Sequence, residues 1–155
     1  MNTENDKLAA LLEPVAELAH LAGEKILSVY NSDEFSVEEK SDKSPLTAAD
    51  LASHHAIVDG LTALTPDIPI LSEESASLPF AERSSWQRYW LVDPLDGTRE
   101  FIKRNGEFTV NIALIEEGIA VLSVVHVPVS GVSYLACKGQ GAFKQEGAGE
   151  RRAIK

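Results

Sequence analysis

The fold is decided by one stretch of the chain, FTVNIALIEEGIAVLSVVHV, which runs from Phe108 to Val127. Two apolar segments rich in β-branched residues flank Glu116-Glu117-Gly118, and this pattern predicts a β-hairpin with the glycine in its loop. A third strand is predicted over residues 132–136, and residues 139–143 are expected to turn into a fourth. The hairpin strands are apolar at most positions, which is typical of strands that are buried on both faces.

Two helices are predicted before these strands. Apolar residues recur at helical spacing from Leu11 onwards, which predicts an amphipathic helix that ends near Asn31 and holds Pro14 in its first turns. A second helix is predicted to begin at Thr47, whose hydroxyl can cap free N–H groups. Shorter features are expected between them and after them: strands at 35–38, 68–71 and 89–92, a loop at 41–45, and a connection with a short helix at 79–87.

Helices followed by an antiparallel meander indicate the α+β class, with the two helices packed on one face of a mainly antiparallel sheet. The length of 155 residues predicts a single domain, residues 1–155. Because the two helices can cover only one face, another layer should cover the second. We therefore expect that a C-terminal portion of the fold is absent from this chain.

Composition limits the classes of partner. The chain has 24 acidic and 14 basic residues, a net charge of −10, and no basic stripe, which argues against nucleic acid. A small anionic substrate stays open, because bound metal ions can invert the local charge. The N-terminus is polar and acidic, unlike a secretory signal, and no apolar run approaches the ~20 residues that a transmembrane span requires. The lone Cys137 excludes an intrachain disulfide, favours a cytoplasmic location, and is predicted to be a buried structural thiol.

The stretch WLVDPLDGT, residues 90–98, predicts a binding site. An apolar strand delivers Asp93 and Asp96 into a tight turn, and the proline after the first of them favours an extended backbone there. Gly97 permits a sharp turn and a close approach of a ligand, and Thr98 offers a hydroxyl and an N–H at the start of a helix or turn. Carboxylates for a hard cation thus lie beside N–H donors for an anion, which is the chemistry of a metal-assisted phosphate site.

Further acidic residues, Asp50 and the pair Glu73-Glu74, also stand where helices or strands begin or end. The strands that lead to Glu73 and to Asp93 are predicted to lie side by side. Closely packed carboxylates repel one another, so a cation must offset them, and oxygen-only ligands favour Mg²⁺, Mn²⁺ or Ca²⁺. Each group alone also has an ordinary interpretation. The pair Glu73-Glu74 could lie in a solvated turn, and Asp50 could be a charge at the start of a helix. The segment 93–97 could be an ordinary turn, because its residue types favour turns.

Three motifs resemble those of the inositol monophosphatase superfamily, in matching order and spacing: Asp93–Thr98 (DPLDGT), Ser72–Ser75 (SEES) and Leu46–Asp50 (LTAAD). The longer stretch 96–115 resembles the bacterial CysQ-type branch, the 3′(2′),5′-bisphosphate nucleotidases, with Arg99 where that branch often has lysine. The resemblance covers nearly the whole chain, from about Leu11 to Phe143. It implies the N-terminal portion of a layered αβαβα fold.

The resemblance also implies a role for each residue. The implied metal ligands are Glu73, Asp93, Asp96 and the backbone carbonyl of Leu95, with Glu74 in an outer position. The N–H groups of Gly97 and Thr98 would hold the phosphate, while Thr98, hydrogen-bonded to Asp50, would position and deprotonate the attacking water. Lys43 would close over the site from its loop. The implied cofactor is two or three Mg²⁺ ions, with Mn²⁺ as a substitute and Li⁺ and Ca²⁺ as inhibitors.

The implied substrate is adenosine 3′,5′-bisphosphate, hydrolysed to AMP and phosphate in sulfate assimilation or nucleotide recycling. Alternatives are an inositol monophosphatase, a sugar bisphosphatase, or a non-catalytic remnant that binds a metal or a partner. The superfamily completes its second metal site with an aspartate of a W-D-x-A-A-type motif that this sequence lacks. Full activity of the 155 residues alone is therefore not expected. A homodimer and peripheral association with the inner membrane both stay open.

Overall fold

A computed structural model describes residues 3–30, 45–72, 86–103, 106–147 and 149–154. The helices are α1 (Thr3–Tyr30), α2 (Pro45–Leu64) and the short α4 (Thr98–Lys103). The strands form one seven-stranded sheet in sequence order: β1 (Ile70–Ser72), β2 (Arg88–Asp96), β3 (Thr109–Glu116), β4 (Ile119–Val127), β5 (Val132–Cys137), β6 (Gly141–Glu146) and β7 (Arg152–Ile154). The expected strand at 35–38, the loop at 41–44 and most of the connection at 79–87 lie outside the described residues.

Both long helices begin earlier than the sequence predicts. α1 begins at Thr3, so Pro14 lies inside the helix, and its placement in the first turns was wrong. Leu8 and Leu12 are buried, so the apolar stripe that docks α1 on the sheet continues N-terminal to the proline. α2 begins at Pro45 rather than at Thr47, because a proline is well suited to the first helical position, where its missing N–H costs no hydrogen bond.

The predicted β3–β4 hairpin is confirmed. Its connection is Glu117-Gly118, and both residues have positive φ, 51° and 81°. Two consecutive positive φ angles are the signature of a type I′ turn, whose twist matches that of the flanking strands. Glu116 therefore belongs to β3 rather than to the loop. The third and fourth strands are also confirmed as β5 and β6, whereas β7 was not predicted, since three residues are too few to show an alternating pattern.

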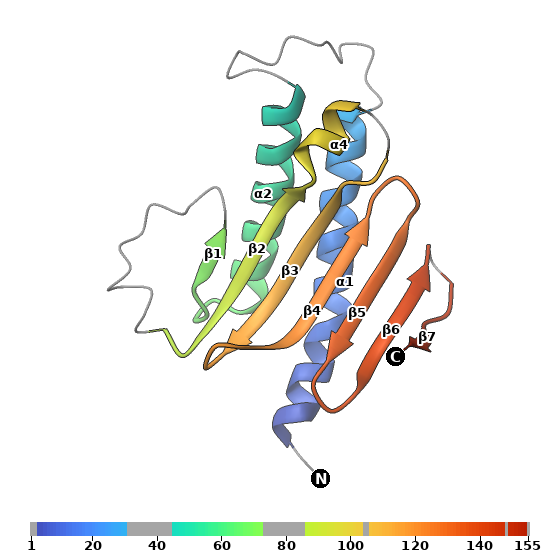
Figure 1. Cartoon of the computed structure of the whole chain (residues 1–155). Helices are drawn as coiled ribbons and strands as arrows, with labels where there is room; N and C mark the ends of the chain where they lie inside the picture. The colour runs from blue at the N-terminus through green and yellow to red at the C-terminus, as the bar shows by residue number, and fades with distance from the viewer. Residues whose placement is uncertain (1–2, 31–44, 73–85, 104–105, 148, 155) are drawn as a thin grey trace.

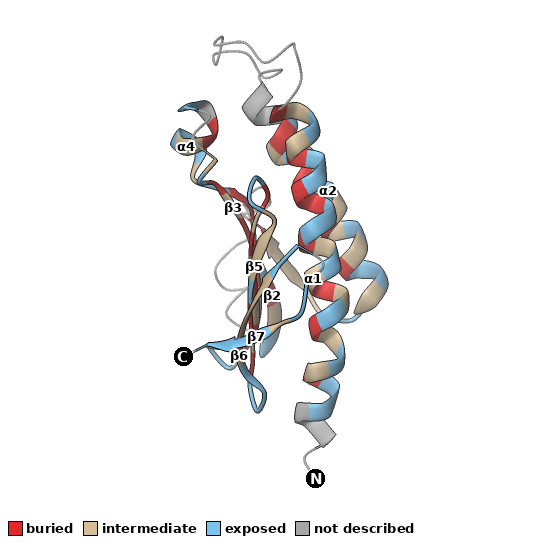
Figure 2. Ribbon diagram, turned by 90° about the vertical axis from the view of Figure 1, so that its right-hand side faces the viewer, coloured by how far each residue is buried: buried red, intermediate tan, exposed pale blue. Residues whose placement is uncertain are grey.

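All neighbouring strands pair antiparallel except β1 and β2, which are parallel. The α+β prediction is confirmed: α1 and α2 lie together on one side of the sheet, as Figures 1 and 2 show. Between the helices and the sheet, Trp90 and Ile112 pack with Val15, Ile26 and Ile57 in a core from which solvent is excluded. Among the described residues, no helix combines the length and hydropathy that crossing a membrane requires.

Neither α1 nor α2 covers the second face of the sheet, and the short α4 lies beyond the upper end of the strands (Figure 2). Leu71, Leu91, Ala113 and Ser123 form one row across β1 to β4 on this face, as the strand register shows. Leu91 is 44% exposed, although its side chain is apolar and such side chains favour burial. A hollow of about 500 Å³ lies along this row and extends to Asp93.

Candidate functional site

The two aspartates of the predicted turn lie in a bulged strand. β2 continues through Asp96, and its pairing with β3 joins Asp93 to Asn111 and Asp96 to Thr109. Three steps along β2 thus match two steps along β3, so β2 contains one extra residue, which defines a β-bulge. Pro94 lies in this bulge, where a missing N–H is tolerated. The predicted tight turn was wrong, because the segment keeps its pairing with β3 on both sides of the bulge.

The bulge brings both carboxylates to one face of the sheet. In a regular strand, residues three apart face opposite sides, and one extra residue restores the same side. Asn111 lies opposite Asp93, and its side-chain Nδ2 donates to Asp96 Oδ2 over 3.0 Å. Since Asn111 and Asp93 also line the hollow on the uncovered face, the acidic bulge opens into that hollow.

Helix α2 supports the bulge from the covered face. The buried hydroxyl of Ser53 donates to the carbonyl oxygen of Pro94 over 2.8 Å. Asp50 precedes Ser53 by one helical turn, so the two side chains are neighbours on the helix surface. One carboxylate oxygen of each acid, Oδ1 of Asp50 and Oδ1 of Asp93, is buried from solvent. The α2 tether therefore fixes the backbone between the two aspartates of β2.

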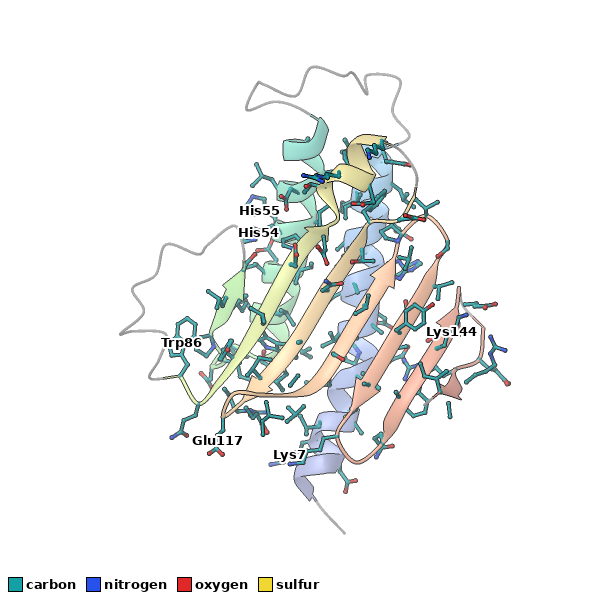
Figure 3. The ribbon with its side chains drawn as sticks, in the orientation of Figure 1. Lys7, His54, His55, Trp86, Glu117 and Lys144 are labelled. Atoms are coloured by element: carbon teal, nitrogen blue, oxygen red, sulfur yellow. The ribbon has the colours of Figure 1, made fainter. Side chains whose placement is uncertain are left out.

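The strand before the glutamate motif lies beside β2, as predicted. The parallel register pairs Ser72 of β1 with Val92 of β2, one residue before Glu73 and Asp93 respectively. Ser72 is buried, and its hydroxyl shares a 2.9 Å hydrogen bond with Nδ1 of His54 on α2, which Figure 3 shows beside this end of the sheet. Glu73, Glu74 and Lys43 lie outside the described residues, so their predicted positions in the site stay predictions.

The residues that follow the bulge turn the chain into a helix. Gly97 has a φ of 92°, a conformation that favours glycine, and a Cβ there would lie tightly against Phe108, 3.3 Å from its Cα. α4 begins at Thr98, so of the predicted helix or turn at this residue the structure has the helix, and the N–H of Phe101 donates to the Gly97 carbonyl over 3.0 Å. The first N–H groups of a helix have no acceptor within the helix. The assignment of Gly97 and Thr98 to a phosphate, and of Thr98 to Asp50, stays a prediction.

The donor chemistry of the bulge fits a magnesium ion. Asp93 and Asp96 share a face, and Leu95, predicted to bind through its carbonyl, lies between them with its side chain buried. Carboxylate and carbonyl oxygens are the ligands that Mg²⁺ prefers. Within the described ranges, no three acidic, histidine or cysteine side chains meet closely enough to hold a metal ion, and the third predicted carboxylate, Glu73, is outside them. The described residues thus fit the ion in chemistry, and their role as its ligands stays a prediction.

Ser53 and Asn111, the polar residues that hold the bulge, were not among the predicted site residues. Asn111 stands between two apolar positions of a strand, where asparagine is disfavoured, and this was a usable signal. Ser53 gives no such signal, because a single serine in a helix is common and its partner lies 41 residues away.

Cys137 is a structural thiol. It is buried on β5, and this burial raises the pKa of the thiol above its ordinary value. A protonated buried thiol is a poor nucleophile. The prediction of a buried, structural cysteine is confirmed.

The fold and the acidic bulge define a class of protein. The chain belongs to the inositol monophosphatase family, whose family model matches residues 7–154.

Within this family, the chain is similar to proteins named 3′(2′),5′-bisphosphate nucleotidase CysQ. It is 56% identical to that of Salmonella typhimurium and 54% identical to that of Escherichia coli K12, each over 145 residues that make up 93% of this chain and 58% of the relative. The crystal structure of CysQ from Bacteroides thetaiotaomicron matches with a TM-score of 0.82 and 44% identity, over 94% of this chain and 53% of that one. The chain thus spans somewhat more than half the length of the relatives that it matches.

Proposed function

We propose that this chain carries the metal- and phosphate-binding machinery of a Mg²⁺-dependent phosphomonoesterase. The proposed reaction removes the 3′-phosphate of adenosine 3′,5′-bisphosphate and yields AMP and phosphate. The observation that carries the proposal is the bulge in β2, which turns Asp93 and Asp96 to one face of the sheet beside a hollow. The similarity to proteins named as bisphosphate nucleotidases supports the reaction class.

The proposed ligands of the metal are Glu73, Asp93, Asp96 and the carbonyl of Leu95, with Glu74 in an outer position. Bound magnesium neutralises charge on the phosphate and lowers the pKa of water. We propose two or three ions, replaceable by Mn²⁺ and inhibited by Li⁺ and Ca²⁺. The bulge supports this proposal, because its register and the hydrogen bond from Asn111 place Asp93 and Asp96 on one face of the sheet.

Four further residues are proposed to bind the substrate, orient the attacking water and accept a proton. The N–H groups of Gly97 and Thr98, at the start of α4, are proposed to donate to phosphate oxygens. The hydroxyl of Thr98 orients the attacking water, and the Asp50 carboxylate accepts the proton through that hydroxyl. Lys43 is proposed to reach the phosphate from its loop.

The nucleotide is favoured over an inositol phosphate or a sugar bisphosphate. The names of the relatives above 50% identity point to a bisphosphate nucleotide as the substrate of those proteins. We extend this substrate to the present chain. We also propose a cytoplasmic location. Self-association as a homodimer is proposed from family resemblance alone.

The test is phosphate release from adenosine 3′,5′-bisphosphate by the 155-residue chain, with E. coli CysQ as the positive control. We expect slow release that requires Mg²⁺, stops with EDTA, and is lost in Asp93→Asn. The matched control is Asp67→Asn, which removes the same charge at an exposed position between α2 and β1. Release that persists in EDTA or in Asp93→Asn would show that the acidic bulge does not carry the reaction.

A further inference from the structure

Asn111 makes a hydrogen bond that the proposed reaction does not use. Its Nδ2 donates to Asp96 Oδ2 over 3.0 Å, and its Oδ1 accepts from the hydroxyl of Thr109 over 3.0 Å. The three residues form a chain from Thr109 through Asn111 to Asp96. All three lie on β2 and β3 at the bulge, where the two strands are out of regular register.

The chemistry of the partners fixes the orientation of the amide. An ionised carboxylate only accepts hydrogen bonds, so Asn111 must present its NH₂ group to Asp96. Its oxygen then faces Thr109, and the hydroxyl, which can donate or accept, donates. The Thr109 hydroxyl therefore locks the amide in the one orientation that binds the carboxylate.

This bond makes the two oxygens of Asp96 unequal. Oδ2 accepts from Asn111, and this bond uses one of its two lone pairs and holds it toward β3. Oδ1 is therefore the more available oxygen for a cation. Mg²⁺ requires near-ideal octahedral geometry and takes few carboxylate oxygens, whereas Ca²⁺ accepts six to eight oxygens and tolerates a carboxylate that binds through both. A carboxylate restricted to one oxygen thus suits the smaller ion.

We infer that Asn111, locked by Thr109, is a positioning residue that restricts Asp96 to one metal-binding oxygen and thereby favours Mg²⁺ over Ca²⁺. The inference rests on the proposed function, because it takes Asp96 as a ligand of the metal. It adds a determinant of ion choice, carried by residues outside the proposed ligand set.

Calorimetric titration of the 155-residue chain with Mg²⁺ and, separately, with Ca²⁺ tests the inference. Loss of a residue that orients a ligand weakens metal binding by about 10-fold or more. In Asn111→Leu we therefore expect Mg²⁺ affinity to fall by about 10-fold while Ca²⁺ affinity changes much less, so that the Mg²⁺/Ca²⁺ preference decreases. The midpoint of urea unfolding, measured without metal, shows whether a variant has merely lost stability.

Thr109 supplies a matched pair of variants. Thr109→Val keeps the shape and removes the hydroxyl, so its ion preference should shift in the same direction as that of Asn111→Leu. Thr109→Ser keeps the hydroxyl and should bind as the unsubstituted chain does. Equal Mg²⁺ affinity in Asn111→Leu and the unsubstituted chain, a higher one, or an equal loss for both ions would overturn the inference.

Asp96→Asn separates this inference from the proposed function. If the unsubstituted chain binds neither ion, or if Asp96→Asn leaves both affinities unchanged, the proposed metal site is wrong and the inference fails with it. If Asp96→Asn weakens binding and Asn111→Leu does not, the metal site stands and only the role of Asn111 is refuted.

Discussion

Replacing Ser53 by alanine should destabilise the fold and loosen the acidic bulge together. Ser53 is fully buried, and its hydroxyl donates to the Pro94 carbonyl over 2.8 Å. In Ser53→Ala, the carbonyl of Pro94, which is itself a buried residue, loses this hydrogen-bond donor. Removal of one partner of a buried hydrogen bond costs about 1–3 kcal/mol, so we expect a loss of about 2 kcal/mol in the free energy of unfolding. For a chain of this size, that loss corresponds to a decrease of about 4–8 °C in Tm.

Urea and thermal unfolding, each without metal, measure this loss, and Mg²⁺ titration measures its consequence for the site. Pro94 lies in the bulge between Asp93 and Asp96, so a looser backbone at Pro94 should disturb the positions of both carboxylates. We therefore expect Mg²⁺ affinity also to fall in Ser53→Ala. Ser28→Ala is the matched control, since Ser28 is an exposed serine on α1 and exposed substitutions change stability by less than about 0.5 kcal/mol. The reasoning is refuted if Ser53→Ala unfolds at the same urea concentration as Ser28→Ala.

Two further predictions concern the packing of α1. A Cβ at Gly60 would lie 2.1 Å from Leu18 Cδ2, so in Gly60→Ala either the Leu18 side chain must change its rotamer or the two helices must move apart. Overpacking costs about 1–3 kcal/mol, whereas alanine gains about 1 kcal/mol over glycine in a helix. We therefore expect a lower urea midpoint, and an unchanged or higher midpoint would contradict this. Burial lowers the pKa of His126 from 6.5 to about 4, so between these values the unfolded chain binds a proton that the folded chain does not. The free energy of unfolding should therefore fall by up to about 3 kcal/mol as the pH decreases from about 6.5 to 4. The urea midpoint of His126→Gln should depend less on pH in this range than that of the unsubstituted chain. An equal pH dependence would show that His126 is not responsible.

Much of the fold could be predicted, because its strongest signals are local. The β3–β4 hairpin follows from β-branched periodicity around a glycine, and the two helices follow from apolar residues at helical spacing. Boundaries were less accurate, since the residues before Leu8 carry no apolar stripe and yet continue α1. β7 could not be predicted, because its three residues show no strand pattern of their own and it is a strand only through its pairing with β6.

The site shows the same division between local and long-range information. Asp93, Asp96 and Gly97 were identified from one continuous motif, in which each residue type has a direct chemical reason. The bulge was not predicted, because it is defined by the register against β3 rather than by the motif itself. The tether from Ser53 also needs the tertiary structure, since it joins a helix to a strand across 41 residues.

The measurement that tests the central claim most directly is paramagnetic broadening by Mn²⁺ in the amide NMR spectrum of the ¹⁵N-labelled chain. Mn²⁺ accepts the oxygen ligands that Mg²⁺ accepts and broadens the resonances near its binding site. We predict that substoichiometric Mn²⁺ first broadens the backbone amides of Asp93 and of residues 95–98 and the side-chain amide of Asn111, and that excess Mg²⁺ restores them. Broadening that begins instead at other acidic positions, such as Glu116 and Glu117 at the opposite end of β3, would contradict a metal site at the bulge.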